Sequence, residues 1–262
     1  MQYALVNDCR TLPCQGAAGT CPACGARAIA KCGPKVVWHW AHSGRRHCDP
    51  WWENETDWHK DWKAAFPEEC REIVQFDSAT GEKHVADVLT PRGLVIELQN
   101  SPMPLGELKS REAFYKRMIW IVNGEPFRGQ LHVLDALPDP DSLFASDLVF
   151  GPVKHNQAGR TFWRLSENPG DRSLVRVHSM RDIEADIHKH YRGHHLFDWV
   201  RPRSVWFDAG APVFIDDGGS TLLWIKRYDD RGLWCIQRVQ KARLIAKNGG
   251  LLEEARIRGA TG

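Results

Sequence analysis

The sequence predicts a mixed α/β fold, of the α+β kind, in three parts: residues 1–50, 51–124 and 125–262. Clustered cysteines and histidines in the first part predict a small metal-binding module of short strands. In the second part the hydrophobic pattern follows the order helix, three strands, helix, strand, which is typical of a mixed sheet with buried central strands. Strand-like segments separated by turn residues predict a β-rich third part.

The composition is that of an ordinary globular protein. The chain has 262 residues, of which 42% are hydrophobic and 26% are charged, which argues against a disordered or fibrous protein. No apolar run approaches the roughly 20 residues that span a bilayer, and residues 1–6 lack the features of a secretion signal. We therefore expect a cytoplasmic protein without a membrane partner. The net charge is +2, and basic residues are concentrated in residues 1–50 and 225–258, where they could contact phosphate.

Six of the eight cysteines lie within the first 48 residues. A chain without an export signal keeps its thiols reduced, so this cluster predicts a metal site rather than disulfides. The segment Cys21–Gly25 reads C-P-A-C-G, and two thiolates at this spacing can face one ion. A tetrahedral zinc site needs two further ligands. The chain offers four candidates downstream: His39, His42, His47 and Cys48.

The choice among these ligands rests on the alternation of side chains along a strand. If residues 38–40 form a strand, the side chains of His39 and His42 point to opposite faces and suit one ion poorly. This favours His42 with Cys48, and the rival pair is His39 with His42. Four protein ligands leave no open position, so a zinc ion here would stabilise the module and not catalyse a reaction. The predicted zinc ligands are Cys21, Cys24, His42 and Cys48.

The second part is predicted to begin with a helix over residues 55–66. Apolar side chains recur there at helical spacing, Asn54 or Thr56 can cap its start, and Pro67 ends it. The elements predicted after it are strands over residues 73–76, 84–89 and 94–99, a helix over 105–116, and an apolar strand over 118–122.

The third part gives weaker signals. Residues 162–165 and 174–177 flank an Asn-Pro-Gly-Asp turn, which predicts a hairpin, and residues 181–191 are predicted to form a helix. The last dozen residues could form a loose basic helix. Two turns rich in Asp and Gly predict a three-stranded meander over residues 213–215, 222–228 and 233–239.

Two acidic residues on the predicted hairpin of the second part suggest a function. The turn at residues 91–93 could bring Asp87 and Glu97 to one edge of the sheet. A charged residue flanked by Val, Ile and Leu is costly to bury unless it is paired or binds a cation. Two carboxylates that meet at a strand end form the kind of oxygen-rich site that Mg²⁺ or Mn²⁺ prefers. A metal-bound water there could hydrolyse a phosphodiester.

Short motifs run through residues 1–124 in this order: Cys21-Pro22-Ala23-Cys24, His39-Trp40-Ala41-His42, Cys48, Glu53-Asn54-Glu55, His59 with Lys63, Ala86-Asp87-Val88, Glu97-Leu98-Gln99-Asn100-Ser101, Arg111 with Tyr115, and Trp120-Ile121. This order resembles the competence protein CoiA family. The resemblance implies an N-terminal zinc-finger-like segment joined to a nuclease domain with a PD-(D/E)XK restriction-endonuclease-like core. No such motif covers residues 125–262.

The resemblance also implies a role for individual residues. Asp87 and Glu97 would be the carboxylates that bind Mg²⁺ or Mn²⁺, and Glu55 would be the acid contributed by the helix. Gln99 stands in the place of the signature lysine, and a neutral amide can hydrogen-bond but cannot supply a positive charge. Lys63 is the nearest candidate for the missing cation.

Three further residues complete the predicted site. His59 lies in the same helical row as Glu55 and Lys63, because these residues are four apart. Arg111 and Tyr115 are also four apart, on the second predicted helix, where they could face the site and touch a DNA phosphate.

The function implied by the resemblance is Mg²⁺- or Mn²⁺-dependent hydrolysis of DNA, single-stranded DNA above all, in DNA uptake during natural transformation. Protein partners in DNA processing are also expected. The alternative is a non-catalytic DNA-binding or scaffold protein with a degenerate nuclease fold. The neutral Gln99 is the residue that keeps this alternative open.

Overall fold

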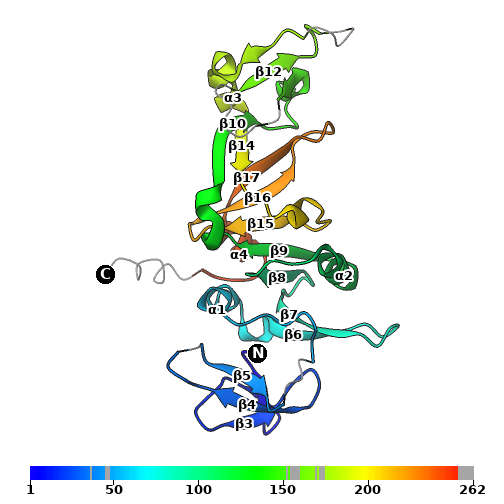
Figure 1. Ribbon diagram of the computed structural model, residues 1–262, viewed down its shortest axis with the longest axis vertical. Helices are drawn as coiled ribbons and strands as arrows, with labels where there is room; N and C mark the ends of the chain where they lie inside the picture. Colours follow the sequence, from blue (N-terminus) through cyan, green and yellow to red (C-terminus); the bar gives the residue numbers. More distant parts are fainter. Residues whose placement is uncertain are drawn as a thin grey trace. The chain divides into compact units, whose positions relative to one another are not determined.

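The computed structural model describes residues 1–35, 37–44, 48–151, 153, 160–168, 170 and 175–252 (Figure 1). The chain forms two compact units, the first made of Met1–Ile121 and the described residues from Ala242 onward, the second of Val122–Lys241. Both contain sheets and short helices, so the fold is mixed α+β. Within the described part of the chain, no helix has both the length and the apolar character needed to cross a membrane.

The first unit begins with a five-stranded antiparallel sheet in the order β2-β1-β3-β4-β5. Asn7 and Asp8 form a two-residue hairpin turn between β1 and β2, and both have positive φ angles, as this turn requires. A small core of Ala4, Ala28 and Trp40 holds the sheet together. The strands are β1 (Ala4–Val6), β2 (Cys9–Thr11), β3 (Ala18–Thr20), β4 (Arg27–Lys31) and β5 (His39–His42).

The rest of the first unit follows the predicted order of helix, three strands, helix and strand. The four strands are neighbours in the order β9-β8-β7-β6. Every residue of β8 and β9 is buried, as their continuous apolar pattern indicates. The elements are α1 (Asp57–Ala64), the 3₁₀ turn Glu68–Cys70, β6 (Arg71–Phe76), β7 (Lys83–Leu89), β8 (Val95–Gln99), α2 (Leu105–Tyr115) and β9 (Met118–Asn123).

The predicted start of the first helix at Glu55 is wrong. Thr56 caps the helix, because its hydroxyl accepts a hydrogen bond from the backbone N–H of His59, and α1 therefore begins at Asp57. Glu55 lies in the segment before the helix. It is consequently not an acid contributed by the helix itself.

The described residues from Ala242 to Leu252 belong to the first unit, whereas the sequence assigned them to a third part at 125–262. Helix α4 (Lys241–Lys247) buries Leu244 and Ile245. After it, the backbone N–H of Leu251 donates to Ala65 O at 2.8 Å. A Cβ atom at Gly250 would lie 2.4 Å from the same Ala65 oxygen, so this close approach requires glycine.

The second unit contains a five-stranded antiparallel arrangement, β10-β14-β17-β16-β15, and a small sheet, β11-β12-β13. The predicted meander is present as β15 (Val213–Asp216), β16 (Thr221–Arg227) and β17 (Trp234–Gln240). The remaining elements are the 3₁₀ turns Glu125–Gln130, Ala145–Asp147, Met180–Ile183 and Ser204–Phe207, strands β10 (Leu131–Pro138), β11 (Leu148–Phe150), β12 (Thr161–Arg164), β13 (His178–Ser179) and β14 (Tyr191–Trp199), and helix α3 (Glu184–His190).

Two predictions for this unit need correction. The strand that pairs with β12 is His178–Ser179 and not residues 174–177, of which Leu174 lies outside the described residues. The helix predicted over 181–191 is split, because a 3₁₀ turn precedes α3 and Tyr191 already begins β14.

His194 on β14 is a buried imidazole, 2% exposed, and within the described part of the chain neither ring nitrogen has a hydrogen-bond partner. Its ring lies against Tyr228, with the ring centres 6.2 Å apart. Burial, and secondarily the charge of Lys226, lowers the pKa of His194 from 6.5 to about 4. The folded chain therefore takes up this proton at a lower pH than the unfolded chain does.

The His194→Leu variant is expected to be about 1–3 kcal/mol more stable, because it removes an unsatisfied buried polar group. Wild-type stability should fall as the pH drops from about 6.5 towards 4, since only the unfolded chain binds the proton in this window. Urea unfolding at pH 5 and pH 7 measures both effects. An unchanged pH dependence in the variant would show that His194 does not cause it.

Candidate metal centre and carboxylate cluster

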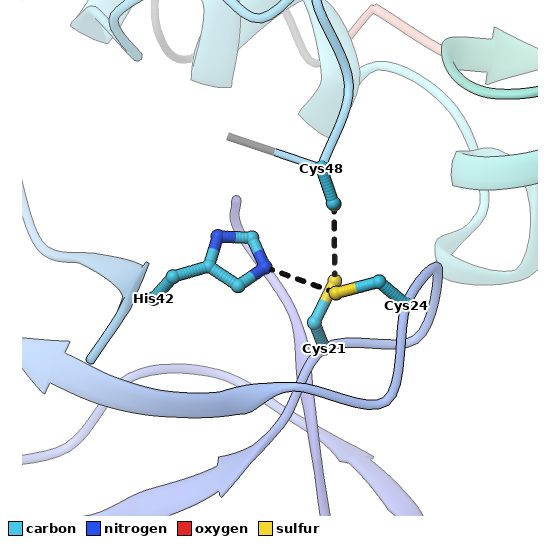
Figure 2. A group of neighbouring side chains, drawn as sticks. All are labelled: Cys21, Cys24, His42 and Cys48. Carbon is cyan, nitrogen blue, oxygen red and sulfur yellow. Dashed lines mark hydrogen bonds between the residues drawn. The ribbon is translucent and has the colours of Figure 1, made fainter. Parts of the chain in front are cut away.

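Cys21, Cys24, His42 and Cys48 come together at one end of strands β3, β4 and β5 of the first sheet. One potential ligand atom from each lies within 4.8 Å of all the others. Figure 2 shows Cys21 and Cys24 on one turn, His42 at the end of a strand, and Cys48 approaching from a separate segment. The Cys24 Sγ lies 3.3 Å from His42 Nε2, and the Cys21 Sγ lies 3.7 Å from Cys48 Sγ. Three sulfurs and one imidazole could hold a structural metal such as zinc.

The backbone of the knuckle is bent as the C-P-A-C-G pattern indicates. Gly25 has φ +71°, and its N–H donates to Cys21 O at 2.9 Å. His39 is not part of the group. It lies three residues before His42 on β5, so the two side chains point to opposite faces of the strand. The Nδ1 of His39 lies 2.8 Å from Val37 O instead. His47 lies outside the described residues.

The wild-type chain is expected to retain about one zinc ion per molecule after dialysis, and Cys24→Ser is expected to lose most of it, because one thiolate ligand is gone. Cys32→Ser is the matched control, since Cys32 lies in the same module and not in the group. Metal analysis by mass spectrometry measures the content. Equal zinc in the two variants would exclude the assigned ligand set.

Asp87 and Glu97 lie opposite each other on the neighbouring strands β7 and β8. The register pairs Val88 with Ile96, which places the two acids at the next position. The Asp87 N–H donates to Glu97 Oε1 at 3.3 Å, and the Leu98 N–H donates to Asp87 Oδ2 at 3.0 Å. The structure therefore brings the two predicted carboxylates together on one face of the sheet.

Glu97 is held in a buried position, with 3% of its surface exposed. Burial, followed by the negative charge of Asp87, raises the pKa of Glu97 to about 8. Arg111 acts in the opposite direction, with its Nη1 3.0 Å from Glu97 Oε2. A buried carboxyl group with a raised pKa, beside a second acid, is the kind of environment found at functional sites.

Lys63 is buried among three carboxylates. Its Nζ lies 2.8 Å from Glu55 Oε1, 2.9 Å from Glu72 Oε1 and 3.8 Å from Asp87 Oδ1. Burial alone would lower the pKa of Lys63, but the charges of Glu72, Glu55 and Asp87 outweigh it and raise that pKa. The lysine thus stays charged beside Asp87, and Glu55 contacts it from the segment before α1.

Glu72 is a member of this cluster that the sequence did not indicate. It lies between Arg71 and Ile73, whose partners are Val88 and Ala86, and so it stands opposite Asp87. Its φ of +46° is in the left-handed region, which is strained for a residue with a side chain. Although burial opposes it, the charge of Lys63 lowers the pKa of Glu72 to about 2.

Glu72 also connects the carboxylate cluster to the start of the chain. The backbone N–H of Gln2 donates to both Glu72 oxygens, at 2.8 and 2.7 Å, and the N–H of Tyr3 donates to one of them at 3.2 Å. These contacts span about 70 positions in sequence. No local pattern could have revealed them, because both the lysine and the amides that bind Glu72 come from other segments.

Glu53 was part of a quoted motif, but no role was predicted for it. Its carboxylate accepts hydrogen bonds from the backbone N–H groups of Asn100 at 3.0 Å and Ser101 at 2.6 Å. Burial opposes ionisation, yet His59, Ser101 and Asn100 together lower the pKa of Glu53 to about 2. Glu53 therefore holds the loop after β8 in place, and both of its carboxylate oxygens accept hydrogen bonds from that loop.

His59 and Gln99 both bind Glu53, and His59 also lines the cavity that contains Asp87 and Glu97. The His59 Nε2 lies 3.3 Å from Glu53 Oε2, and its Nδ1 lies 2.8 Å from the hydroxyl of Thr56. Gln99 Nε2 donates to Glu53 Oε1 at 3.3 Å. Both side chains therefore contact Glu53, and the catalytic role predicted for them stays a prediction.

Arg111 and Tyr115 face the carboxylates from α2. Arg111 Nη2 donates to Trp51 O at 2.7 Å and to Glu107 at 2.5 Å, whereas its buried Nε has no hydrogen-bond partner among the described residues. The Tyr115 hydroxyl is likewise buried without a partner in that part of the chain. Burial, and next the charge of Glu97, raises the pKa of Tyr115, so the hydroxyl remains a donor.

A cavity of about 220 Å³ opens beside these groups. Its lining includes the carboxylates, the lysine and the α2 donors: Glu55, Lys63, Glu72, Asp87, Glu97, Arg111 and Tyr115. Comparisons of the chain with protein-family models, with curated proteins and with solved structures find no significant match. The cavity offers an acidic pair that can bind a cation and donors that can bind an anion.

Proposed function

We propose that this chain is a divalent-cation-dependent nuclease that acts on DNA, of the kind that the resemblance to the CoiA family implies. The paired carboxylates of Asp87 and Glu97, one of them buried with a raised pKa, carry the proposal. The order of helix, three strands, helix and strand, with neighbours β9-β8-β7-β6, supports a PD-(D/E)XK-like core around them. A structural zinc ion in the Cys/His group completes the proposal.

The donor set fits a hard divalent cation. Mg²⁺ is commonly bound through one or two carboxylates while it keeps several waters, and Asp87 and Glu97 supply two. Asp87 has 23% of its side chain exposed at the cavity, so an ion can reach it. When bound, Mg²⁺ or Mn²⁺ would activate water and polarise phosphate oxygens for hydrolysis of a phosphodiester.

The remaining groups of the cavity suit a phosphate. The unpartnered Nε of Arg111 and hydroxyl of Tyr115 are donors one helical turn apart, and they can bind phosphate oxygens. Lys63 supplies a fixed positive charge next to Asp87, in a position where the neutral Gln99 cannot. Together these residues would orient a phosphodiester against the acidic pair and stabilise the negative charge that develops on it.

A second candidate is a DNA-binding or scaffold protein without activity, which works with other DNA-processing proteins. The contact between Arg111 Nη1 and Glu97 Oε2, 3.0 Å long, favours it, because the guanidinium gives this buried group a partner without a metal. Lys63 does the same for Asp87 at 3.8 Å. A site in which each acidic side chain has a basic partner can keep its fold even when the protein no longer hydrolyses DNA.

Incubation of the zinc-loaded chain with single-stranded and plasmid DNA tests the proposal. We expect cleavage with added Mn²⁺, no cleavage without a divalent cation, and much slower cleavage by the Glu97→Gln variant. Salt-dependent DNA binding without cleavage would instead support the scaffold. Neither cleavage nor binding would contradict both candidates.

A further inference from the structure

The segment from Cys48 to Glu55 links the Cys/His group to the carboxylate cluster, and its burial alternates along the chain. Asp49, Trp51, Glu53 and Glu55 are half-buried, whereas the residues between them are exposed, Trp52 to 41%. Residues 49–52 form a turn, in which the Trp52 N–H donates to Asp49 O at 3.3 Å, and residues 52–56 have no regular structure. Alternate residues of the segment are therefore the ones that contact the core.

Asp49 contacts the strand that carries Asp87. Its Oδ2 accepts a hydrogen bond from the backbone N–H of Val85 at 2.9 Å, and its Oδ1 lies 2.9 Å from His84 Nδ1. Val85 and Asp87 are two residues apart on β7 and share a face. A displacement of Asp49 would therefore remove a contact to β7 at Val85, two residues before Asp87, the acid of the proposed cation site.

Trp51 reaches the second carboxylate through Arg111. The same guanidinium donates to Trp51 O at 2.7 Å and lies 3.0 Å from Glu97 Oε2. The Trp51 ring also stacks on His84, with 3.2 Å between the ring centres. The segment thus contacts both members of the acidic pair indirectly. Asp49 contacts β7, which carries Asp87, and Trp51 contacts Arg111, which binds Glu97.

Cys48 anchors the other end of this segment. It directly precedes Asp49, and it is the one ligand of the group that comes from outside the five-stranded sheet and its turns. Figure 2 shows it entering from its own stretch of chain. A metal held by all four ligands would fix Cys48, and thereby the start of the segment, to the sheet.

We propose that Asp49 is a positioning residue that makes the affinity of the Asp87–Glu97 pair for a divalent cation depend on the metal in the Cys/His group. The inference rests on the proposed cation site at that pair. Loading of the first site orders the segment, and the ordered segment holds β7 and Arg111 in the geometry that the second site needs. The two sites are then coupled, and each ion strengthens the binding of the other.

Mn²⁺ affinity of the full chain, measured by electron paramagnetic resonance of free Mn²⁺, tests the coupling. Mn²⁺ prefers oxygen ligands, so it reports on the carboxylates and not on the thiolates. The zinc-depleted chain is expected to bind Mn²⁺ at least about tenfold more weakly than the zinc-loaded chain. Reloading with one equivalent of zinc should restore the affinity.

The Asp49→Ala variant separates the positioning role from zinc binding itself. It is expected to retain zinc, to bind Mn²⁺ about as weakly as the zinc-depleted wild type, and to respond little to zinc. Glu82→Ala is the matched control, because Glu82 contacts the other ring nitrogen of His84 at 2.8 Å but lies outside the segment. This control should bind Mn²⁺ like the wild type. If Asp49→Ala does not fold, Asp49→Asn takes its place, and its affinity should also fall.

The outcomes distinguish the inference from the proposed function. Equal Mn²⁺ affinity with and without zinc, or an Asp49 variant that matches the Glu82→Ala control, would overturn the inference and leave the cation site intact. No Mn²⁺ binding to the zinc-loaded wild type would overturn the proposed cation site, and the coupling with it.

Discussion

The Glu97→Gln variant is expected to cleave DNA about a thousandfold more slowly than the wild-type chain. Glutamine keeps the shape of the side chain, and its carbonyl oxygen can still accept the hydrogen bond from Asp87 N–H. It lacks the negative charge that would bind the proposed cation, and such an ion contributes several kcal/mol to the stabilisation of the transition state. Each 1.36 kcal/mol corresponds to a factor of about ten in rate.

The same variant has a signature that does not depend on activity. The pKa of Glu97 is about 8 in the folded chain, against 4.5 for an ordinary glutamate, so between these values only the folded chain binds the proton. Without divalent cations, the free energy of unfolding should therefore fall as the pH rises from about 4.5 to 8. Glu97→Gln should remove much of this slope.

Urea unfolding at pH 5, 6.5 and 8, in the absence of divalent cations, measures the slope. Glu107→Gln is the matched control, because Glu107 also binds Arg111 but is more exposed, at 28%. Its pH dependence should resemble that of the wild type. A wild-type slope that survives in Glu97→Gln, or full cleavage by this variant, would show that Glu97 is not the buried acid that binds the cation.

The Lys63→Met variant is expected to lose about 3–5 kcal/mol of stability, the range observed when one partner of a buried ion pair is removed. Methionine has a similar length but leaves Glu55, Glu72 and Asp87 next to one another without a cation. Urea unfolding at pH 7 provides the measurement. Lys60→Met, one turn earlier on α1, should change stability by less than about 0.5 kcal/mol.

The double variant Lys63→Met with Glu72→Gln identifies the cause. Removal of one carboxylate should recover part of the stability lost in Lys63→Met, since the two residues lie 2.9 Å apart and their effects are not additive. Additive losses, or a Lys63→Met variant as stable as Lys60→Met, would mean that Lys63 does not compensate the carboxylates.

The Cys/His group is the part of the site that the sequence predicted best. The C-x-x-C spacing and the bend after it are local features, and strand alternation correctly separated His39 from His42. The position of Asp87 opposite Glu97 also follows from the alternation of side chains along each strand and from the short turn between the two strands. In both cases neighbours in sequence determine where the side chains point.

The interactions around the acidic pair could not be predicted in this way. Glu72 needs a positive φ inside a strand and partners about 70 residues away, so its role depends on tertiary structure. Glu53 accepts hydrogen bonds from a loop nearly 50 residues later. Glu55 was placed on the helix because its spacing to Lys63 is helical, whereas Thr56 caps the N-terminus and the helix begins only at Asp57.

Strands β10 and β14 of the second unit were missed for a different reason. The polar, histidine-rich start of β14 lacks strand-like alternation, although His194 and Leu196 are in fact its buried face. The segment after Ala242 was assigned to the third part because its return to Ala65 depends on tertiary contacts, among them a backbone hydrogen bond from Leu251 and the close approach of Gly250.

A crystal structure of the zinc-loaded chain grown with Mn²⁺ tests the central claim most directly, through an anomalous difference map recorded at the manganese edge. We expect one manganese peak in contact with carboxylate oxygens of both Asp87 and Glu97, and no such peak in crystals of Glu97→Gln. A map in which these two side chains contact no metal, with Arg111 still paired to Glu97 in the presence of saturating Mn²⁺, would contradict it.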